Sequence, residues 1–184
     1  MNIINTDFPG LYIIEPKIFA DDRGYFFESY NYAQLEKLGI TTKFVQDNQS
    51  KSSYGVLRGL HYQLEPNAQT KLIRVLEGTI LDVVVDIRKG SPMFGKWFSI
   101  ELSSENKKQL FIPHGFAHGF SVLSETAVVM YKCDQFYSPQ SERGIIYNDP
   151  ELGIDWKIPA SKAVLSPKDQ VHPLLKNADI NFSF

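Results

Sequence analysis

The sequence predicts an all-β protein built as a jelly-roll barrel with one short helix. Three observations support this prediction: short apolar runs recur along the whole chain, turn residues separate them, and only one segment has helix signals. Aromatic residues make up 13% of the chain, and they favour the pleated surface of a sheet. Many short strands with evenly spaced turns are typical of a closed sandwich or barrel.

In the N-terminal part we expect strands at residues 11–15 and 25–30, the second after a polar turn at residues 21–24. Asn31 is suited to cap a helix over residues 32–38, because its side-chain oxygen can accept a hydrogen bond from a free N–H of the first turn. This is the only helix that the sequence predicts.

The middle of the chain predicts most of the barrel. Strands are expected at residues 43–49, 56–63, 71–76, 79–87, 97–102, 109–112, 119–122 and 127–133. Within 79–87, Leu81, Val83 and Val85 alternate with Asp82 and Asp86, which predicts one face in a core and one face carrying carboxylates. The irregular, proline-containing tail after Pro150 is expected to wrap around the barrel.

Composition argues against nucleic-acid binding, membrane binding and secretion. The 184 residues fit one domain, 1–184, with a sizeable core. A net charge of −2 and an isoelectric point near 6.1 give no basic field for nucleic acid or an anionic membrane. The single cysteine, Cys133, excludes an internal disulfide, and residues 1–8 lack a signal pattern. These features predict a cytoplasmic protein.

The segment G-V-L-R-G-L-H-Y-Q, residues 55–63, places Arg58 and His61 in one short strand. Regular alternation would put Arg58, Leu60 and Tyr62 on one side and His61 on the other. Histidine accepts protons near neutral pH and arginine binds phosphate, so the pair suggests proton chemistry on a phosphorylated substrate. A half-buried strand with a hydrogen-bonded histidine and a surface arginine explains the same residues.

A metal site is the first candidate for a barrel with several histidines, since His114 and His118 lie near one another in the sequence. Metal-binding jelly rolls use two histidines in a His-x-His pattern, followed by a carboxylate and a later histidine. Here Gln63 follows His61 at that spacing, and the next polar candidate is Lys71, whose ammonium would repel a cation. We therefore expect no catalytic metal.

Acid–base chemistry is the remaining candidate. Lys71 could stabilise an oxyanion or be a solvated lysine at the start of a strand. Tyr131 could donate a proton or be a core tyrosine with a satisfied hydroxyl. Asp169 could orient a histidine or be an ordinary turn aspartate. Sequence spacing alone does not bring these residues to His61, whereas a barrel interior could.

A family resemblance assigns these residues. The motifs that carry it are Arg23-Gly24-Tyr25-Phe26-Phe27-Glu28, Gln46-Asp47-Asn48, Val56-Leu57-Arg58-Gly59-Leu60-His61, Gly115-Phe116-Ala117-His118-Gly119-Phe120, Tyr131-Lys132, Asn148-Asp149-Pro150, Leu152-Gly153-Ile154 and the segment 165–169. Together they resemble the dTDP-4-dehydrorhamnose 3,5-epimerases, in order, from about residue 8 to residue 175. The resemblance implies a cupin-like double-stranded β-helix barrel that works as a homodimer without a metal or other cofactor.

The resemblance also implies residue roles. The catalytic residues would be His61 as base, Asp169 as its orienting partner, Tyr131 as acid and Lys71 at the keto oxygen of the sugar. The nucleotide-sugar contacts would be Arg23, Glu28, Gln46, Asp47, Asn48, Arg58, Lys71, His118, Tyr137, Glu142 and Lys168, with Tyr137 stacking on thymine. The segment around residues 23–28 would come from the partner subunit. His114 and His172 receive no role.

The implied substrate, dTDP-4-dehydro-6-deoxy-D-glucose, has a C4 ketone that acidifies the hydrogens on C3 and C5. Removal of one proton gives an enolate, and reprotonation from the opposite face inverts the centre. A relative that inverts only C3 or only C5 remains the nearest alternative, although Tyr131 favours inversion at C5 as well. A non-catalytic sugar-nucleotide binder or structural jelly roll is the alternative from another class. The sequence does not reveal the order of the two inversions or the polysaccharide that receives the sugar.

Overall fold

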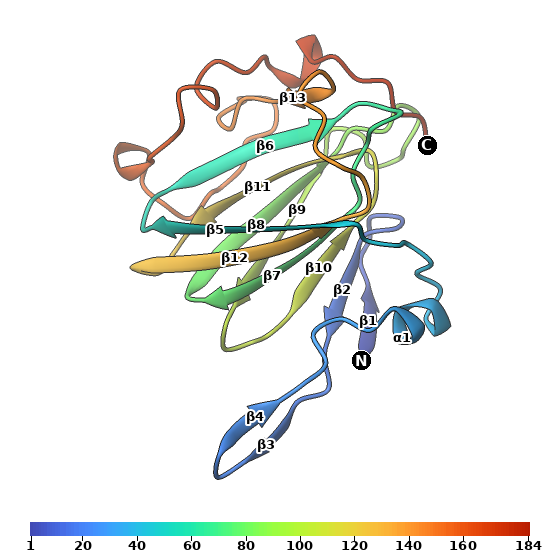
Figure 1. The fold of residues 1–184 in the computed structure, drawn as a ribbon. Coiled ribbons are helices and arrows are strands. Elements are labelled where there is room, and N and C mark those ends of the chain that lie inside the picture. The colour runs from blue at the N-terminus through green and yellow to red at the C-terminus, as the bar shows by residue number, and fades with distance from the viewer.

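The strands form two antiparallel sheets that face each other, as the ribbon of the computed structural model shows for all 184 residues (Figure 1). One sheet has the order β1 (Asn2–Asn5), β2 (Tyr12–Glu15), β10 (Gln109–Ile112), β7 (Lys71–Glu77), β12 (Thr126–Cys133) and β5 (Gln46–Ser53). The other has the order β13 (Glu142–Gly144), β6 (Leu57–Gln63), β11 (Phe116–Val122), β8 (Thr79–Asp86) and β9 (Trp97–Ser103). This jelly-roll architecture confirms the predicted fold class.

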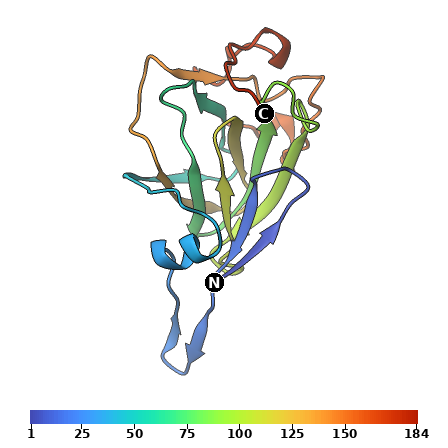
Figure 2. The same ribbon diagram turned by 90° about the vertical axis from the view of Figure 1, so that its right-hand side faces the viewer.

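A separate hairpin, β3 (Phe19–Asp21) and β4 (Gly24–Phe26), projects from the barrel in both views (Figures 1 and 2). The helix α1 (Tyr32–Lys37) follows it, and the Asn31 side chain accepts a hydrogen bond from the backbone N–H of Gln34 at 3.2 Å, as the cap prediction requires. Leu35 buries the inner face of this helix. Two short 3₁₀ helices, Ala160–Lys162 and Leu175–Asn177, lie in the C-terminal tail.

The five-stranded sheet is covered on both faces. Its inner face meets the six-stranded sheet, where Val84 and Phe120 pack with Ile73 and Val129. Its outer face packs under the C-terminal tail, which supplies Trp156, Ile180 and Phe182 to a second core. The tail therefore wraps one side of the barrel, as expected. Figure 1 shows it over the side that carries β6 and β13.

Because both faces of this sheet are covered, side chains on both faces of β8 are buried. Leu81, Val83 and Val85 pack beneath the tail, whereas Asp82 and Asp86 lie on the inner face and are fully buried. The alternation was predicted correctly, but the carboxylates need partners because they are shielded from water. His118 contacts both oxygens of Asp82, and Arg88 pairs with Asp86.

Several strands differ from the sequence prediction. The strand expected at 43–49 is β5 at Gln46–Ser53, and the one expected at 25–30 ends at Phe26. β1, β3 and β13 were not predicted. β5 is polar throughout, so it has no apolar run, and its pairing with β12 over eight positions fixes it in the sheet.

β6 is the strand whose faces differ most from the prediction. Arg58 and His61 both line the internal cavity, while Leu60 and Tyr62 pack into the core beneath the tail. The prediction of opposite sides for Arg58 and His61 was therefore wrong. The physical reason is a register shift between β6 and β11, centred on Gly59, which has a φ of +127°.

The close approach of β6 and β11 requires glycine at position 59. A Cβ added there would lie 2.5 Å from the Cα of Gly119 and 2.8 Å from the carbonyl oxygen of His118. Neither backbone atom can move without disturbing the strand pair, so the bulge that turns both Arg58 and His61 into the cavity depends on this glycine.

We predict that Gly59→Ala destabilises the protein by roughly 2–5 kcal/mol, combining a positive-φ penalty of about 1–2 kcal/mol with an overpacking cost of about 1–3 kcal/mol. Gly24→Ala is the matched control, because Gly24 has a φ of +126° but no neighbour within 4 Å of its added Cβ. The free energy of unfolding of both variants, measured by urea denaturation, separates the positive-φ penalty from the overpacking cost. Equal destabilisation would show that the contact with Gly119 is unimportant.

Candidate active site

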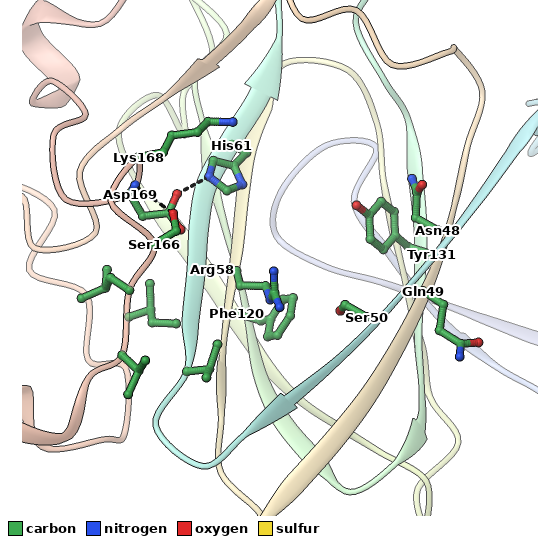
Figure 3. A pocket seen from close by; sticks show the side chains of 14 residues that line it. Asn48, Gln49, Ser50, Arg58, His61, Phe120, Tyr131, Ser166, Lys168 and Asp169 are labelled. Carbon is green, nitrogen blue, oxygen red and sulfur yellow. Dashed lines mark hydrogen bonds and ion pairs between the residues drawn. The ribbon is translucent and has the colours of Figure 1, made fainter.

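The space between the sheets contains a cavity of about 600 Å³ (Figure 3). An adjoining cavity of about 340 Å³ shares three of its lining residues, Asn48, His61 and Tyr131. The two volumes therefore form one cleft, with Asn48, His61 and Tyr131 where they adjoin. The full lining comprises Gln46, Asn48, Gln49, Ser50, Val56, Leu57, Arg58, His61, Tyr62, Gln63, Gln69, Lys71, Phe120, Tyr131, Tyr137, Glu142, Val164, Leu165, Ser166, Lys168 and Asp169.

The structure brings His61 and Asp169 together across 108 positions of sequence. Nε2 of His61 lies 2.5 Å from Oδ1 of Asp169, whose side chain is almost completely buried. The tail reaches β6 because Val164 exchanges backbone hydrogen bonds with Leu57 and Gly55. These contacts place the following turn, which carries Asp169, against His61.

The electrostatics favour an ionised Asp169. Burial by itself raises the pKa of this carboxyl, but the hydrogen bond and charge of His61, with a hydrogen bond from Ser166, outweigh burial and leave the pKa below its usual value. His172 lies beside the pair, and its pKa is lowered by burial and by the nearby His61. The group beside His61 is therefore a carboxylate flanked by a neutral imidazole.

Tyr131 and Lys71 approach the cleft from the six-stranded sheet. Figure 3 shows Tyr131 across the cavity from His61. Lys71 opens β7, and its Nζ lies 5.9 Å from the centroid of the Tyr131 ring. Burial raises the pKa of the Tyr131 phenol and lowers the pKa of the Lys71 ammonium. A protonated phenol facing a carboxylate-supported imidazole can provide an acid and a base on opposite sides of one bound molecule.

Arg58 is the free cation of the larger cavity. Its Nε and Nη2 donate to Oγ of Ser52 at 3.2 Å, and no carboxylate pairs with it. Lys168, at the same cavity, forms an ion pair with Glu142. A guanidinium without a counter-ion, held by a neutral hydroxyl, is suited to bind an anion.

The smaller cavity holds a connected polar group. The Tyr137 hydroxyl donates to Oε2 of Glu142 at 2.8 Å, and the Tyr137 backbone N–H donates to Gln46 at 3.1 Å. Gln46 in turn donates to Asn48. The exposed ring of Tyr137 gives this cavity an aromatic surface beside hydrogen-bonding groups.

Four predicted contact residues do not line the cleft of this chain. Arg23 and Glu28 lie on and just after the projecting hairpin, with 90% of the Arg23 side chain exposed. Asp47 points to the outer face of β5, where it pairs with Lys132, since Gln46 and Asn48 occupy the inner positions of the same strand. His118 lies in the barrel interior against Asp82.

Sequence reasoning missed Ser52, Phe120 and Ser166. Ser52 holds Arg58, Phe120 lines the cavity, and Ser166 accepts a hydrogen bond from the Asp169 N–H at 3.2 Å. The only available signal was the spacing of Ser166 three residues before Asp169, typical of a polar turn. His114, left without a role, bridges Glu65 and Asp134 through different ring nitrogens.

One cluster has donor atoms close enough to share a metal ion, and it consists of His61, Asp169 and His172, whose ligand atoms lie within 4.8 Å of one another. No helix in the structure is sufficiently long and apolar to span a membrane.

Comparison with known proteins gives a consistent result. Residues 5–177 match the family model for dTDP-4-dehydrorhamnose 3,5-epimerase. The chain is 55% identical to the protein of that name from Shigella flexneri over 170 residues, 92% of this chain and 93% of the relative. It is 51% identical to the Escherichia coli K12 protein of that name over 171 residues, 92% of each chain.

The solved structures agree. The epimerase from Legionella pneumophila, in complex with dTDP-4-keto-L-rhamnose, superposes with a TM-score of 0.92 at 55% identity and 97% coverage of this chain and 94% of that one. A 3′-monoepimerase from Streptomyces bikiniensis, in complex with dTDP-quinovose, gives a TM-score of 0.86 at 32% identity, with 93% of this chain and 86% of that one covered.

The lowered pKa of Asp169 predicts how stability varies with pH. Because the folded pKa lies below the unfolded value near 3.9, ionised Asp169 stabilises the fold above that value, and this contribution is lost as the pH falls through the folded pKa. Denaturation of wild type and Asp169→Asn should therefore show the largest stability gap near neutral pH and a smaller one below about pH 4. A gap that is constant with pH would contradict the His61–Asp169 coupling.

Proposed function

The chain belongs to the dTDP-4-dehydrorhamnose 3,5-epimerase family, and we propose that His61, Asp169, Tyr131 and Lys71 carry out its reaction on dTDP-4-dehydro-6-deoxy-D-glucose. The observation that carries this proposal is the placement of the His61–Asp169 pair and Tyr131 on opposite walls of one cleft. The product is dTDP-4-dehydro-L-rhamnose, and no redox step is involved.

His61 removes the proton. Its Nε2 is bonded to Asp169, so the lone pair of Nδ1 is the basic site. When Nδ1 accepts a proton from C3 or C5, the electron pair of the broken C–H bond passes into an enolate whose charge collects on the C4 oxygen. The Asp169 carboxylate stabilises the imidazolium that results and fixes the tautomer of the neutral ring.

Lys71 and Tyr131 complete the inversion. The Lys71 ammonium stabilises the C4 enolate oxygen through a charge-assisted hydrogen bond. The Tyr131 phenol then donates its proton to the carbon from the opposite face. A raised phenol pKa keeps that proton in place until the carbanion forms. Exchange with water resets the imidazolium and the phenolate, so atoms and charges balance over one inversion.

The nucleotide is assigned to groups beside the reacting ring. Arg58 and Lys168 are the cations for the diphosphate, and Arg58 is the stronger candidate because Lys168 is already paired with Glu142. Tyr137 supplies the ring that stacks on thymine, with Glu142, Gln46 and Asn48 as polar neighbours. Their positions around one cleft support this assignment.

The family contacts of Arg23 and Glu28 are assigned to a partner subunit. These two residues lie on or beside a hairpin that projects away from the cleft of its own chain. Phe19, Tyr25 and Phe26 on that hairpin are more than half exposed, which is costly unless another surface covers them. A homodimer in which each hairpin reaches the other cleft accounts for both observations.

A cytoplasmic location is part of the same proposal. The single cysteine is buried and free, which suits a reducing compartment. Immunodetection in separated cytoplasmic, periplasmic and membrane fractions tests it, and recovery outside the cytoplasmic fraction would oppose it.

The overall activity predicts the products. Wild-type enzyme with dTDP-4-dehydro-6-deoxy-D-glucose in deuterated water should exchange the hydrogens at both C3 and C5 in proton NMR spectra, and reduction of the trapped product should give dTDP-L-rhamnose. Exchange confined to C3 would instead make the protein a 3-epimerase, the activity named for the Streptomyces bikiniensis relative.

His61→Ala should retain the fold and lower the turnover rate by a factor on the order of a hundred to ten thousand, the usual contribution of a general base. His114→Ala is the matched control, since His114 is also paired with carboxylates but lies outside the cleft lining. If His61→Ala kept more than about a tenth of wild-type turnover, against that same scale, the base would be another residue.

Arg58→Ala should weaken binding of dTDP, which has the diphosphate but lacks the sugar, by roughly tenfold or more, the effect expected from losing a charge-assisted contact. Isothermal titration calorimetry measures this affinity directly, and Lys132→Ala is the control because Lys132 pairs with Asp47 on the outer face. Unchanged dTDP affinity in Arg58→Ala would move Arg58 from the diphosphate to the sugar.

The dimer proposal predicts that Phe26→Asp, at an exposed hairpin position, shifts the protein towards monomers in sedimentation velocity experiments and lowers its activity. Phe136→Asp changes an equally exposed aromatic residue outside the hairpin and should leave the sedimentation coefficient unchanged. A wild-type protein that sediments as a monomer at micromolar concentration would refute the shared site.

A further inference from the structure

His172 is a histidine of the site that the proposed chemistry does not use. Its ring lies 5.6 Å from the His61 ring, centroid to centroid, and its Nε2 lies 3.6 Å from the same Asp169 oxygen that His61 contacts. The ring packs directly on the backbone of β13, where a Cβ at Gly144 would come within 2.5 Å of it. Its position three residues after Asp169 and its packing against β13 together hold this imidazole next to His61 and Asp169.

The Nε2 atom of His172 is buried and has no hydrogen-bond partner. A buried polar atom without a partner is uncommon in folded proteins and calls for a physical reason. Here the atom faces a carboxylate oxygen and a second imidazole, which are the two kinds of donor that zinc sites combine with histidine.

The spacing of the three donors is close to that of a tetrahedral site. With metal–ligand bonds of about 2.0–2.1 Å, the ligand atoms of a tetrahedron lie roughly 3.3 Å apart. The observed separations are 2.5 Å from His61 to Asp169 and 3.6 Å from His172 to Asp169, one shorter and one longer than that edge. All three ligand atoms lie within 4.8 Å of one another, and a fourth ligand would enter from the cleft that His61 and Asp169 line.

The charges around these three side chains also favour a bound cation. Asp169 contributes a carboxylate, and the nearest lysine on the tail, Lys168, is already neutralised by Glu142. Lys71 lines the smaller cavity, and of the three donors only His61 lines that cavity too, whereas Asp169 lines the larger cavity and His172 lines neither. Two of the three donors therefore lie outside the cavity that Lys71 shares with Gln63.

We propose that His61, Asp169 and His172 bind one Zn²⁺ ion and that this ion reversibly inhibits the enzyme. When Nε2 of His61 binds the ion, the single proton of the neutral ring moves to Nδ1 and occupies the basic atom, while Asp169 becomes a metal ligand and no longer orients the ring. The inhibition rests on the proposed role of His61, whereas the binding site itself rests only on the geometry of the three side chains.

Binding is tested on tag-free, chelator-treated enzyme by isothermal titration calorimetry with Zn²⁺ and by the visible absorption of Co²⁺. Wild type should bind one equivalent with a tetrahedral Co²⁺ spectrum. His172→Asn and Asp169→Asn should each weaken binding at least tenfold, so the test does not depend on one variant folding well, and circular dichroism checks both. His114→Asn is the matched control and should bind as wild type does, because its carboxylate neighbours contact opposite ring nitrogens.

Inhibition is tested separately, with each variant compared with its own zinc-free activity. Wild type and His114→Asn should lose activity as Zn²⁺ is added and regain it with a chelator, whereas His172→Asn should need at least tenfold more Zn²⁺ for the same fractional loss. Absence of stoichiometric binding, or equal affinity in wild type and His172→Asn, would overturn the zinc site. Stoichiometric, His172-dependent binding without inhibition would uphold the site and overturn the role of His61 as base.

Discussion

The hydrogen bond between His61 and Asp169 is the contact on which the site depends. It joins a strand of the barrel to a tail residue 108 positions later, and it satisfies a carboxylate that is almost completely withdrawn from water. A buried charge of this kind needs a partner, and His61 can be that partner because it faces the cavity where the backbone contacts of Val164 hold the tail against β6. The bulge at Gly59 provides that orientation, because it turns Arg58 and His61 to the same side of β6.

The two-sheet architecture separates the proposed base, His61, from the proposed acid, Tyr131. His61 comes from the five-stranded sheet and Tyr131 from the six-stranded sheet, so the width of the barrel interior lies between them. Inversion of a carbon centre needs a proton acceptor on one face and a donor on the other. Burial raises the pKa of both the Tyr131 phenol and the Asp169 carboxyl, but the hydrogen-bond partners of Asp169 outweigh burial and leave the pKa of that carboxyl lowered. The fold thus supplies both the geometry and the protonation states.

The sequence predicts the fold class and ten of the residues that line the cleft, but not how these residues are arranged. The apolar runs of β7, β8 and β12 predicted their strands directly, whereas β5 is polar on both faces, and its second half, beyond the strand expected at 43–49, is fixed by its pairing with β12. The motif Gln46-Asp47-Asn48 matched as a unit, yet a strand sends alternate residues to opposite faces, so Asp47 lies outside. The bulge at Gly59 and the position of His172 arise from contacts between distant segments, which no local pattern contains.

The central claim is that His61 removes the proton and Tyr131 returns one from the other face. The most direct measurement follows Tyr131→Phe in deuterated water by proton NMR, with substrate exchange and formation of the L-configured product recorded together. The phenylalanine ring preserves packing but has no proton to donate. The account predicts continued loss of the C–H signal that His61 can reach, with little L-configured product, so that exchange is separated from inversion. Normal yields of L-sugar from this variant would contradict it.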